Sequence, residues 1–145
     1  MYNKPKFVIF EGPDKVGKST LFRLFRSETK YGPLAIDRFT GSNWVYDTHY
    51  NRESGLEDLL TSEENLQAVY DCYLIVLGCE STTLLNRIQE QETGMDLTIA
   101  LENVTSATTL FAKYFDTTRY TKKLWLDTTD KTPEQSLQLI LEFIN

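Results

Sequence analysis

The chain has 145 residues, a mass of 16.8 kDa and a formal net charge of −6, which fits one domain over residues 1–145. Its 41% hydrophobic and 25% charged residues exclude wholesale disorder. With no apolar run of about 20 residues and no leader-like N-terminus, we expect no membrane segment and no secretion signal. The acidic balance argues against a general nucleic-acid coat protein, and two cysteines without a CxxC pair predict a reducing, cytoplasmic location.

Short apolar runs alternate with amphipathic stretches along the chain. Residues 6–10 (KFVIF) are apolar at nearly every position, which is typical of a strand buried on both faces of a sheet. Strands are predicted at residues 6–10, 34–39, 71–78 and 123–127. Helices are predicted at residues 18–29, 42–52, 56–70, 81–91 and 96–115, and from Pro133 behind a capping box that begins at Thr132. This alternation predicts an α/β fold, with a parallel sheet of about four strands flanked by helices.

The turn after the first predicted strand carries a complete phosphate-loop motif. Residues 12–19 read GPDKVGKS and match GxxxxGK[ST] between a strand and a helix, the context in which this pattern binds nucleotides. Gly12 and Gly17 let the backbone curl so that its N–H groups face a phosphate, and the helix N-terminus adds positive partial charge. Lys18 would reach the β- and γ-phosphates, and the Ser19 hydroxyl would bind Mg²⁺. The motif predicts a P-loop NTPase fold that uses ATP and Mg²⁺.

The second predicted strand runs through Asp37 and Arg38, and this pair helps to choose between classes of P-loop protein. A switch GTPase needs an NKxD segment, which the sequence lacks. A motor NTPase usually carries a carboxylate after four apolar residues, whereas residues 74–77 (LIVL) are followed by Gly78. An Asp-Arg pair suits a kinase better, with Asp37 for Mg²⁺ or the acceptor oxygen and Arg38 for a second phosphate.

Two segments carry a family resemblance. Residues 10–20 (FEGPDKVGKST) resemble the FEGxDxxGKST loop of thymidylate kinases, and residues 37–46 (DRFTGSNWVY) are similar to that family's DRYxxSxxAY segment. Residues 73–88 and 124–135 resemble, more weakly, the strand and helix that lead into the lid and the last strand and helix. The resemblance runs from end to end and implies a kinase that acts on a deoxynucleoside monophosphate.

The resemblance also implies roles for single residues. Asp14 matches the loop acid that approaches the 3′-hydroxyl of the acceptor sugar, and Lys15 stands where one type of thymidylate kinase has an arginine that neutralises the transferring phosphoryl group. Arg38 matches the arginine that grips the acceptor monophosphate, and Tyr46 matches the aromatic residue under a deoxyribose. Arg87 stands where the resemblance places a cation stacked on adenine.

The predicted site combines the motifs with the resemblance. The predicted ATP ligands are Gly12, Asp14, Val16, Gly17, Lys18, Ser19, Thr20 and Arg87. The predicted acceptor ligands are Asp14, Arg38, Ser42 and Tyr46. The predicted catalytic residues are Lys15, Lys18, Asp37 and Arg38, and the predicted metal ligands are Ser19 and Asp37. The single histidine, His49, is predicted to lie exposed on a helix.

The chain departs from the family on the acceptor side. In thymidylate kinases a long segment separates the loop helix from the Asp-Arg strand, whereas here Thr29 and Asp37 are nearly adjacent. The missing segment carries a strand, an arginine for the acceptor phosphate and the aromatic residue that stacks on the base. The segment that would correspond to the lid of thymidylate kinases is also poor in positive charge, because no arginine follows Arg87 until Arg119. The identity of the acceptor base is therefore left open.

Three hypotheses remain at this point. The first is ATP- and Mg²⁺-dependent phosphoryl transfer to a deoxynucleoside monophosphate (dTMP-like), giving the diphosphate. The second is a P-loop kinase with a larger acceptor, such as a hydroxylated base in DNA. The third is a degenerate nucleotide-binding module, against which the intact motifs argue. A small-molecule nucleotide is the expected partner, a homodimer could complete the acceptor side, and so compact a chain would suit a bacteriophage.

Overall fold

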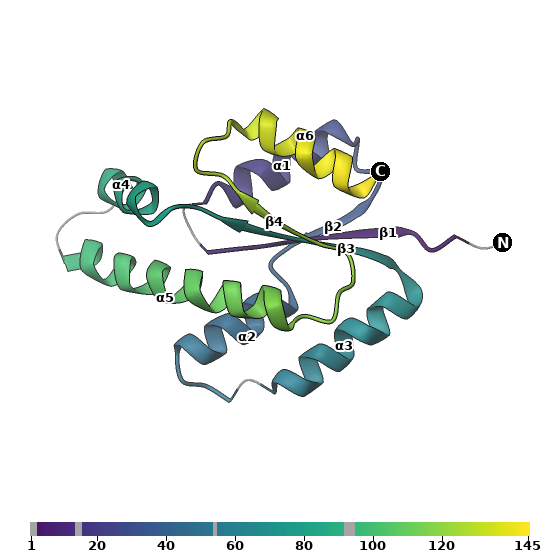
Figure 1. Cartoon of the computed structure of the whole chain (residues 1–145), viewed down its shortest axis with the longest axis horizontal. Coiled ribbons are helices and arrows are strands. Elements are labelled where there is room, and N and C mark those ends of the chain that lie inside the picture. Colours follow the sequence, from purple (N-terminus) through teal and green to yellow (C-terminus); the bar gives the residue numbers. More distant parts are fainter. Residues whose placement is uncertain (1–2, 14–15, 54, 92–94) are drawn as a thin grey trace.

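The fold is described by a computed structural model that covers residues 3–13, 16–53, 55–91 and 95–145. Within these ranges four strands alternate with six helices (Figure 1). The strands are β1 (Lys6–Glu11), β2 (Leu34–Asp37), β3 (Asp71–Gly78) and β4 (Lys123–Asp127). The helices are α1 (Lys18–Glu28), α2 (Thr40–His49), α3 (Leu56–Val69), α4 (Ser81–Gln91), α5 (Met95–Thr117) and α6 (Pro133–Ile144). The predicted α/β fold is confirmed.

The four strands form one parallel sheet in the order β2-β1-β3-β4. β1 and β3 lie at its centre, and every residue of β3 after Asp71 is buried. A strand that is covered on both faces buries the side chains of successive residues on opposite sides. This burial explains why both central strands are apolar at almost every position, without the alternation of a half-exposed strand.

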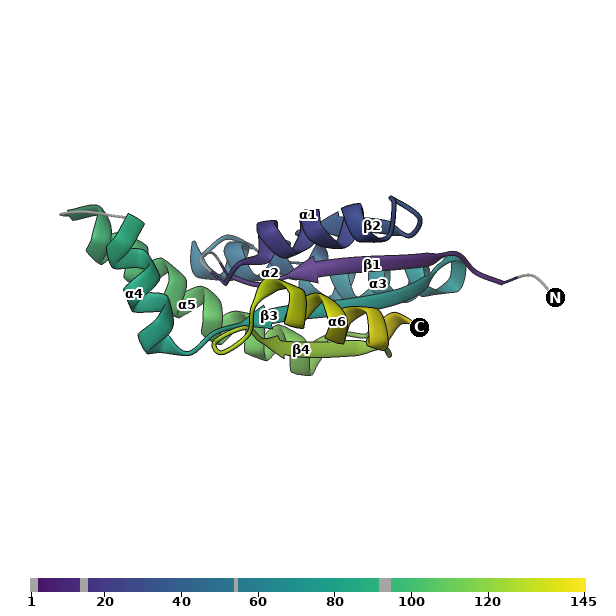
Figure 2. The same cartoon turned by 90° about the horizontal axis from the view of Figure 1, so that it is seen from above.

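Successive residues of β1 contribute to two separate cores. Val8 and Phe10 pack in the core under α1 and α6, whereas Ile9 packs in the core under α2 and α5. Figure 1 shows these two layers of helices on opposite faces of the sheet, with α3 in the same layer as α2 and α5. Figure 2 shows that α4 extends past the carboxyl ends of the strands. The sheet is thus the middle layer of three, and its carboxyl edge is flanked by helices.

The register of the sheet brings the first two strand ends together. Phe10 of β1 lies beside Asp37 of β2, so the last residue of β2 is close to Gly12, where the phosphate loop begins. On the other side of β1, Glu11 lies beside Val76 of β3. All carboxyl ends of a parallel sheet meet at one edge, and ligands of such sheets bind there. The fold therefore places the two specific motifs of the sequence side by side.

The predicted boundary between the second strand and the following helix is wrong by two residues. β2 ends at Asp37 rather than at residue 39, and α2 spans Thr40–His49 rather than residues 42–52. The physical reason is a tertiary contact, because the carboxylate of Glu11 accepts hydrogen bonds from the N–H groups of Phe39 and Ser42. With these groups paired, the helix begins earlier than its own sequence indicates.

Two other local predictions have different outcomes. The capping box of α6 is confirmed, since the Thr132 hydroxyl accepts from Gln135 N and the Gln135 side chain accepts from Thr132 N. The exposure predicted for His49 is wrong. Its ring is half-buried between α2 and α5, with Nδ1 2.8 Å from Ser106 Oγ and Nε2 2.9 Å from Asn103 Oδ1. The histidine therefore ties the two helices together.

Both cysteines are free thiols. Burial raises the pKa of the Cys72 thiol to about 11, so this group is protonated and unreactive at neutral pH. In the ranges that the structure covers, no helix is long and apolar enough to cross a membrane.

The tight contact at Gly12 yields a prediction about stability. Gly12 has φ +146°, and a Cβ added there would lie 2.7 Å from the backbone oxygen of Leu77. We expect Gly12→Ala to lower the free energy of unfolding by about 2 kcal/mol or more, because backbone strain adds to overpacking. Urea unfolding followed by circular dichroism measures this loss.

Gly55→Ala is the matched control for that variant. Gly55 also has positive φ (+54°), but the nearest atom to an added Cβ is Asp58 Oδ2, at 3.8 Å. The free energy of unfolding of this control should fall by only about 1 kcal/mol, which is the cost of an alanine in the left-handed backbone conformation. Equal destabilisation of the two variants would contradict the close approach of Gly12 to β3.

Candidate functional site

The described part of the phosphate loop has the backbone geometry of an anion site. Gly12 has φ +146°, and Gly17, the N-cap of α1, has φ +84°, which are conformations that favour glycine. Among the described residues no side chain caps the start of α1, and its first N–H groups have no partner within the helix. These N–H groups can therefore bind a phosphate. Asp14 and Lys15 lie outside the described residues, and their roles stay predictions.

The loop lysine reaches the end of β2. Lys18 Nζ lies 2.8 Å from Asp37 Oδ1, and the two side chains are 5% and 24% exposed. An ion pair that is largely screened from water is much stronger than one on the surface. The pair therefore holds the lysine at the carboxyl edge of the sheet, next to the strand end that carries Arg38. Two residues predicted to be catalytic, Lys18 and Asp37, are in direct contact.

The donor groups at this edge fit Mg²⁺. Ser19 is exposed in the first turn of α1, and Asp37 is partly exposed at the end of β2, so both present oxygen atoms. Among the residues that the structure describes, no group of three or more His, Cys, Asp or Glu side chains could hold a metal by itself. Mg²⁺ usually takes one or two protein oxygens and completes its shell with substrate phosphates and water. Ser19 and Asp37 suit that pattern.

Arg38 and Tyr46 are brought together by the start of α2. The guanidinium carbon of Arg38 lies 5.3 Å from the centroid of the Tyr46 ring. The ring itself packs edge-on against Phe111 of α5, with centroids 6.2 Å apart. Arg38 has φ +71°, which is uncommon for a residue other than glycine and is found at functional sites. Two of the predicted acceptor ligands therefore form one unit beside the loop.

Ser42 has a different environment from the one predicted. Its side chain is only 7% exposed, and its hydroxyl donates to Glu11 Oε1 at 2.6 Å. Because the hydroxyl donates to a buried carboxylate, Ser42 helps to orient α2, and its role as an acceptor ligand stays a prediction. Glu11 has no predicted role, although it precedes the loop within a recognised motif. Its pairing with a helix 31 residues away has no signal in the sequence.

A small cavity of about 160 Å³ lies beside the loop. The predicted ATP ligands Val16, Gly17, Thr20 and Arg87 line it, together with residues of the segment after β4. Thr128 in that segment donates its hydroxyl to the backbone oxygen of Val16 at 2.9 Å. Sequence analysis missed Thr128, and the only available signal was its place directly after the carboxyl end of a predicted strand.

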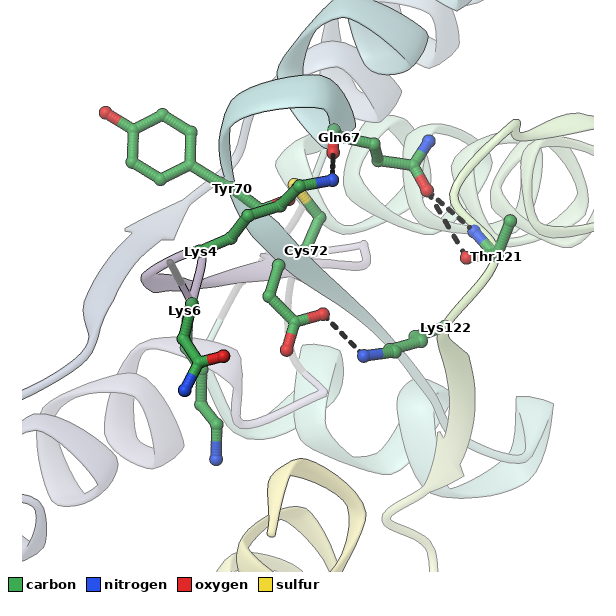
Figure 3. Close-up of a pocket in the computed structure, with 9 residues that line it drawn as sticks. Lys4, Lys6, Gln67, Tyr70, Cys72, Thr121 and Lys122 are labelled. Atoms are coloured by element: carbon green, nitrogen blue, oxygen red, sulfur yellow. Dashed lines mark hydrogen bonds and ion pairs between the residues drawn. The ribbon is translucent and has the colours of Figure 1, made fainter. Parts of the chain in front are cut away.

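A larger cavity, of about 490 Å³, lies at the opposite edge of the sheet, where β1 and β3 begin (Figure 3). Three lysines line it, but each amino group already has an acceptor in the protein. Lys4, Lys6 and Lys122 donate to Gln67 O (2.8 Å), Ile144 O (2.5 Å) and Asp71 Oδ1 (2.5 Å). These bonds join the start of β1 to α3 and α6, and the start of β4 to β3. We therefore regard this cavity as part of the packing of the fold and assign no ligand to it.

Comparison with known proteins supports the fold. No protein-family model matches the chain, and no curated protein matches it. The solved structure of YorR from Bacillus subtilis, in complex with phosphorylated GDP, is similar with a TM-score of 0.79 and 18% identity, over 95% of each chain. Thymidylate kinase from Candida albicans is similar with a TM-score of 0.60 and 12% identity, over 99% of this chain and 92% of that one.

A third similar structure is polyphosphate kinase 2 from Arthrobacter aurescens TC1. Its TM-score is 0.65 at 11% identity, and the match covers 99% of this chain and 69% of that one. At such identities a likeness shows the fold and leaves the function to be argued from the site. The chain has the P-loop NTPase fold that these structures share, and the predicted fold class is confirmed.

Proposed function

We propose that the chain is a P-loop kinase that transfers the γ-phosphoryl group of ATP to a deoxynucleoside monophosphate, with Mg²⁺ as cofactor. The observation that carries the proposal is the 2.8 Å contact between Lys18 and Asp37, with Arg38 next in the chain. A loop lysine, a carboxylate and a second cation then share one edge of the sheet. The phosphorylated GDP in the complex with YorR, a protein of the same fold, supports a nucleotide as ligand.

On the donor side, the loop and α1 bind the triphosphate of ATP. Backbone N–H groups at the start of α1 and the Lys18 ammonium group face the β- and γ-phosphates. Ser19 and Asp37 would hold the metal ion, and charge neutralisation at the phosphate oxygens is the chemistry that Mg²⁺ supplies when bound. Lys18 leaves Asp37 when the phosphates arrive, because they offer it more negative charge. The cavity lined by Val16 and Arg87 would take the adenine.

On the acceptor side, Arg38 binds the monophosphate and Tyr46 orients the guanidinium group. An oxygen of this phosphate forms a bond to the γ-phosphorus, the bond from that phosphorus to the bridging oxygen breaks, and ADP leaves. A phosphate monoester has its second pKa near about 6, so at neutral pH the attacking oxygen carries no proton. The reaction therefore needs positioning and positive charge, and it needs no general base.

The described carboxylates agree better with a phosphate acceptor than with a hydroxyl acceptor. A hydroxyl would have to lose a proton to a base within reach. Glu11 is fully buried and accepts three hydrogen bonds from the start of α2, and in the proposed complex Asp37 would hold the metal ion. Neither is placed as a base in this state of the site.

A second candidate is a kinase that acts on a larger acceptor, such as a hydroxylated base in DNA. One observation favours it. β2 has only four residues and forms the edge of the sheet, so in the described ranges no further strand covers the acceptor side. A bulky acceptor could approach Arg38 from this open edge. The net charge of −6 weighs against a polyanionic substrate.

One panel of acceptors tests the proposal. The chain is incubated with Mg²⁺, ATP labelled at the γ-phosphate and each of the nucleoside and deoxynucleoside monophosphates, nucleosides and DNA oligomers, and labelled products are resolved. We expect a labelled deoxynucleoside diphosphate, and Lys18→Ala should lower the rate of its formation by 10²-fold or more, as is typical for lost charge stabilisation.

Lys113→Ala, on the exposed face of α5, is the matched control and should leave the rate unchanged. Label in DNA would favour the second candidate. Label in no acceptor, or near wild-type transfer by a folded Lys18→Ala variant, would contradict both.

A second prediction separates the two sides of the site. We expect Arg38→Ala to raise the KM for the monophosphate by at least about tenfold, since hydrogen bonds to charged groups contribute about 1.5–3 kcal/mol. The KM for ATP should change by less than about twofold, because the loop is intact. Steady-state kinetics with each substrate varied in turn measures both constants.

Arg52→Ala is the control for Arg38→Ala. Arg52 also stacks on a tyrosine, with its guanidinium carbon 5.3 Å from the Tyr50 ring, but it lies on the surface with 59% of its side chain exposed. Its replacement should change neither KM. If Arg38→Ala raised the KM for ATP and left the KM for the monophosphate unchanged, Arg38 would belong to the donor side.

A further inference from the structure

The first turn of α2 has no capping side chain of its own. Its N-cap is Phe39, whose φ and ψ are −151° and −131°, and the side chain of a phenylalanine cannot accept a hydrogen bond. The first N–H groups of a helix have no partner within it, and leaving them buried and unpaired is costly. Since Thr40, Gly41 and Ser42 are all buried, their partners must come from elsewhere in the fold.

Glu11, the last residue of β1, supplies the partner of Ser42 N in this turn and of Phe39 N just before it. Its Oε2 accepts hydrogen bonds from Phe39 N (3.1 Å) and Ser42 N (3.0 Å), and its Oε1 accepts one from the Ser42 hydroxyl (2.6 Å). Ser42 is the third residue of α2, and its N–H is one of the two that an N-cap side chain usually binds. A negative charge at a helix N-terminus adds a favourable interaction with the helix dipole. Glu11 thus caps α2 from a different element.

The contact between Glu11 and α2 is closely packed. Glu11 is 0% exposed, and its burial raises its pKa, while hydrogen bonds from Ser42 and Phe39 and the charge of Lys18 act in the opposite direction. A Cβ at Gly41 would lie 2.7 Å from Glu11 Oε2 and 2.5 Å from Tyr114 Cε2. Only glycine fits between the carboxylate and the tyrosine ring, so the turn packs directly against α5.

Glu63 of α3 holds the same turn from another side. It is also 0% exposed, and it accepts hydrogen bonds from the hydroxyls of Thr40 (2.9 Å), Tyr114 (2.6 Å) and Thr118 (2.6 Å) and from Arg119 N (2.9 Å). Thr40 is the first residue of α2. The turn is therefore fastened to β1 through one buried carboxylate and to α3 and α5 through another.

We propose that Glu11 is a positioning residue for the acceptor: by capping α2 it holds Arg38 at a set place beside the phosphate loop. This inference rests on the proposed function. Glu11 is covalently joined to Gly12, the first residue of the loop. Arg38 directly precedes the capped turn, and its N–H donates to the backbone oxygen of Phe10 at 2.9 Å. One side chain thus links the donor half of the site to the acceptor half.

Two substitutions test this role without altering the loop. Ser42→Ala removes one of the three hydrogen bonds and leaves Glu11 in place. Glu11→Gln keeps the shape, since the amide oxygen can accept from the two N–H groups and the amide nitrogen can donate to the Ser42 hydroxyl, but it removes the charge. Ser62→Ala is the control, because Ser62 is an exposed hydroxyl of α3 that donates to Asp58 O at 3.0 Å.

Two measurements are made on each variant. The first is hydrogen exchange at the amides of Phe39 and Ser42, followed by NMR without any ligand. The second is the KM of the deoxynucleoside monophosphate and of ATP. We expect Ser42→Ala and Glu11→Gln to speed exchange at these two amides and to raise the KM of the monophosphate about tenfold, the equivalent of about one hydrogen bond. The KM of ATP should stay within about twofold, and Ser62→Ala should change neither quantity.

Three results would overturn the inference. Unchanged exchange at Phe39 and Ser42 would show that Glu11 does not cap α2. A rise in the KM of ATP equal to that of the monophosphate would show a general structural role. In both cases the wild-type chain still phosphorylates its acceptor, so the proposed function stands. If the wild-type chain phosphorylates no acceptor, the proposed function fails and the inference fails with it. Should Glu11→Gln not fold, Ser42→Ala decides alone.

Discussion

The candidate site depends on one buried carboxylate at the end of the central strand. Removing Glu11 from water costs several kcal/mol unless donors surround it, and the donors come from the first turn of α2. The carboxylate therefore stabilises the fold only while that turn stays in contact with β1. This requirement joins the end of β1, where the phosphate loop begins, to the segment that carries Arg38.

Two cations meet at the carboxyl edge of the sheet in this acidic chain. The parallel register places Asp37 beside Phe10, and Lys18 crosses from α1 to reach that carboxylate. Arg38 then follows at the same edge, with its guanidinium group over Tyr46. Two cations on neighbouring elements can bind the phosphates of two substrates, the phosphoryl donor and the phosphoryl acceptor. A single phosphate loop without Arg38 would account for nucleotide binding but for no acceptor.

The features that are predictable from the sequence are those whose causes are local. The phosphate loop is a contiguous motif, the buried strands are continuous apolar runs, and the capping box of α6 lies within four residues. The start of α2 could not be predicted, because its cap is Glu11 on β1. The hydrogen bonds of His49 to α5 could not be predicted for the same reason, since their partners are distant in sequence. The hydrogen bond from Ser42 to Glu11 also joins residues that are distant in sequence. Hydrogen bonds between distant elements produce no pattern in the sequence. The residues of the motifs could therefore be predicted, whereas the residues that orient the site could not.

The proposed function requires a donor site and an acceptor site on either side of the same loop. Calorimetric titration with a bisubstrate analogue, in which adenosine and a deoxynucleoside are joined by five phosphates, tests it most directly. A linked ligand that occupies both sites gains affinity over either half without any new contact. We predict one molecule bound per chain, at least about 10²-fold more tightly than ATP, with this gain lost in Arg38→Ala. An affinity equal to that of ATP alone would contradict the account.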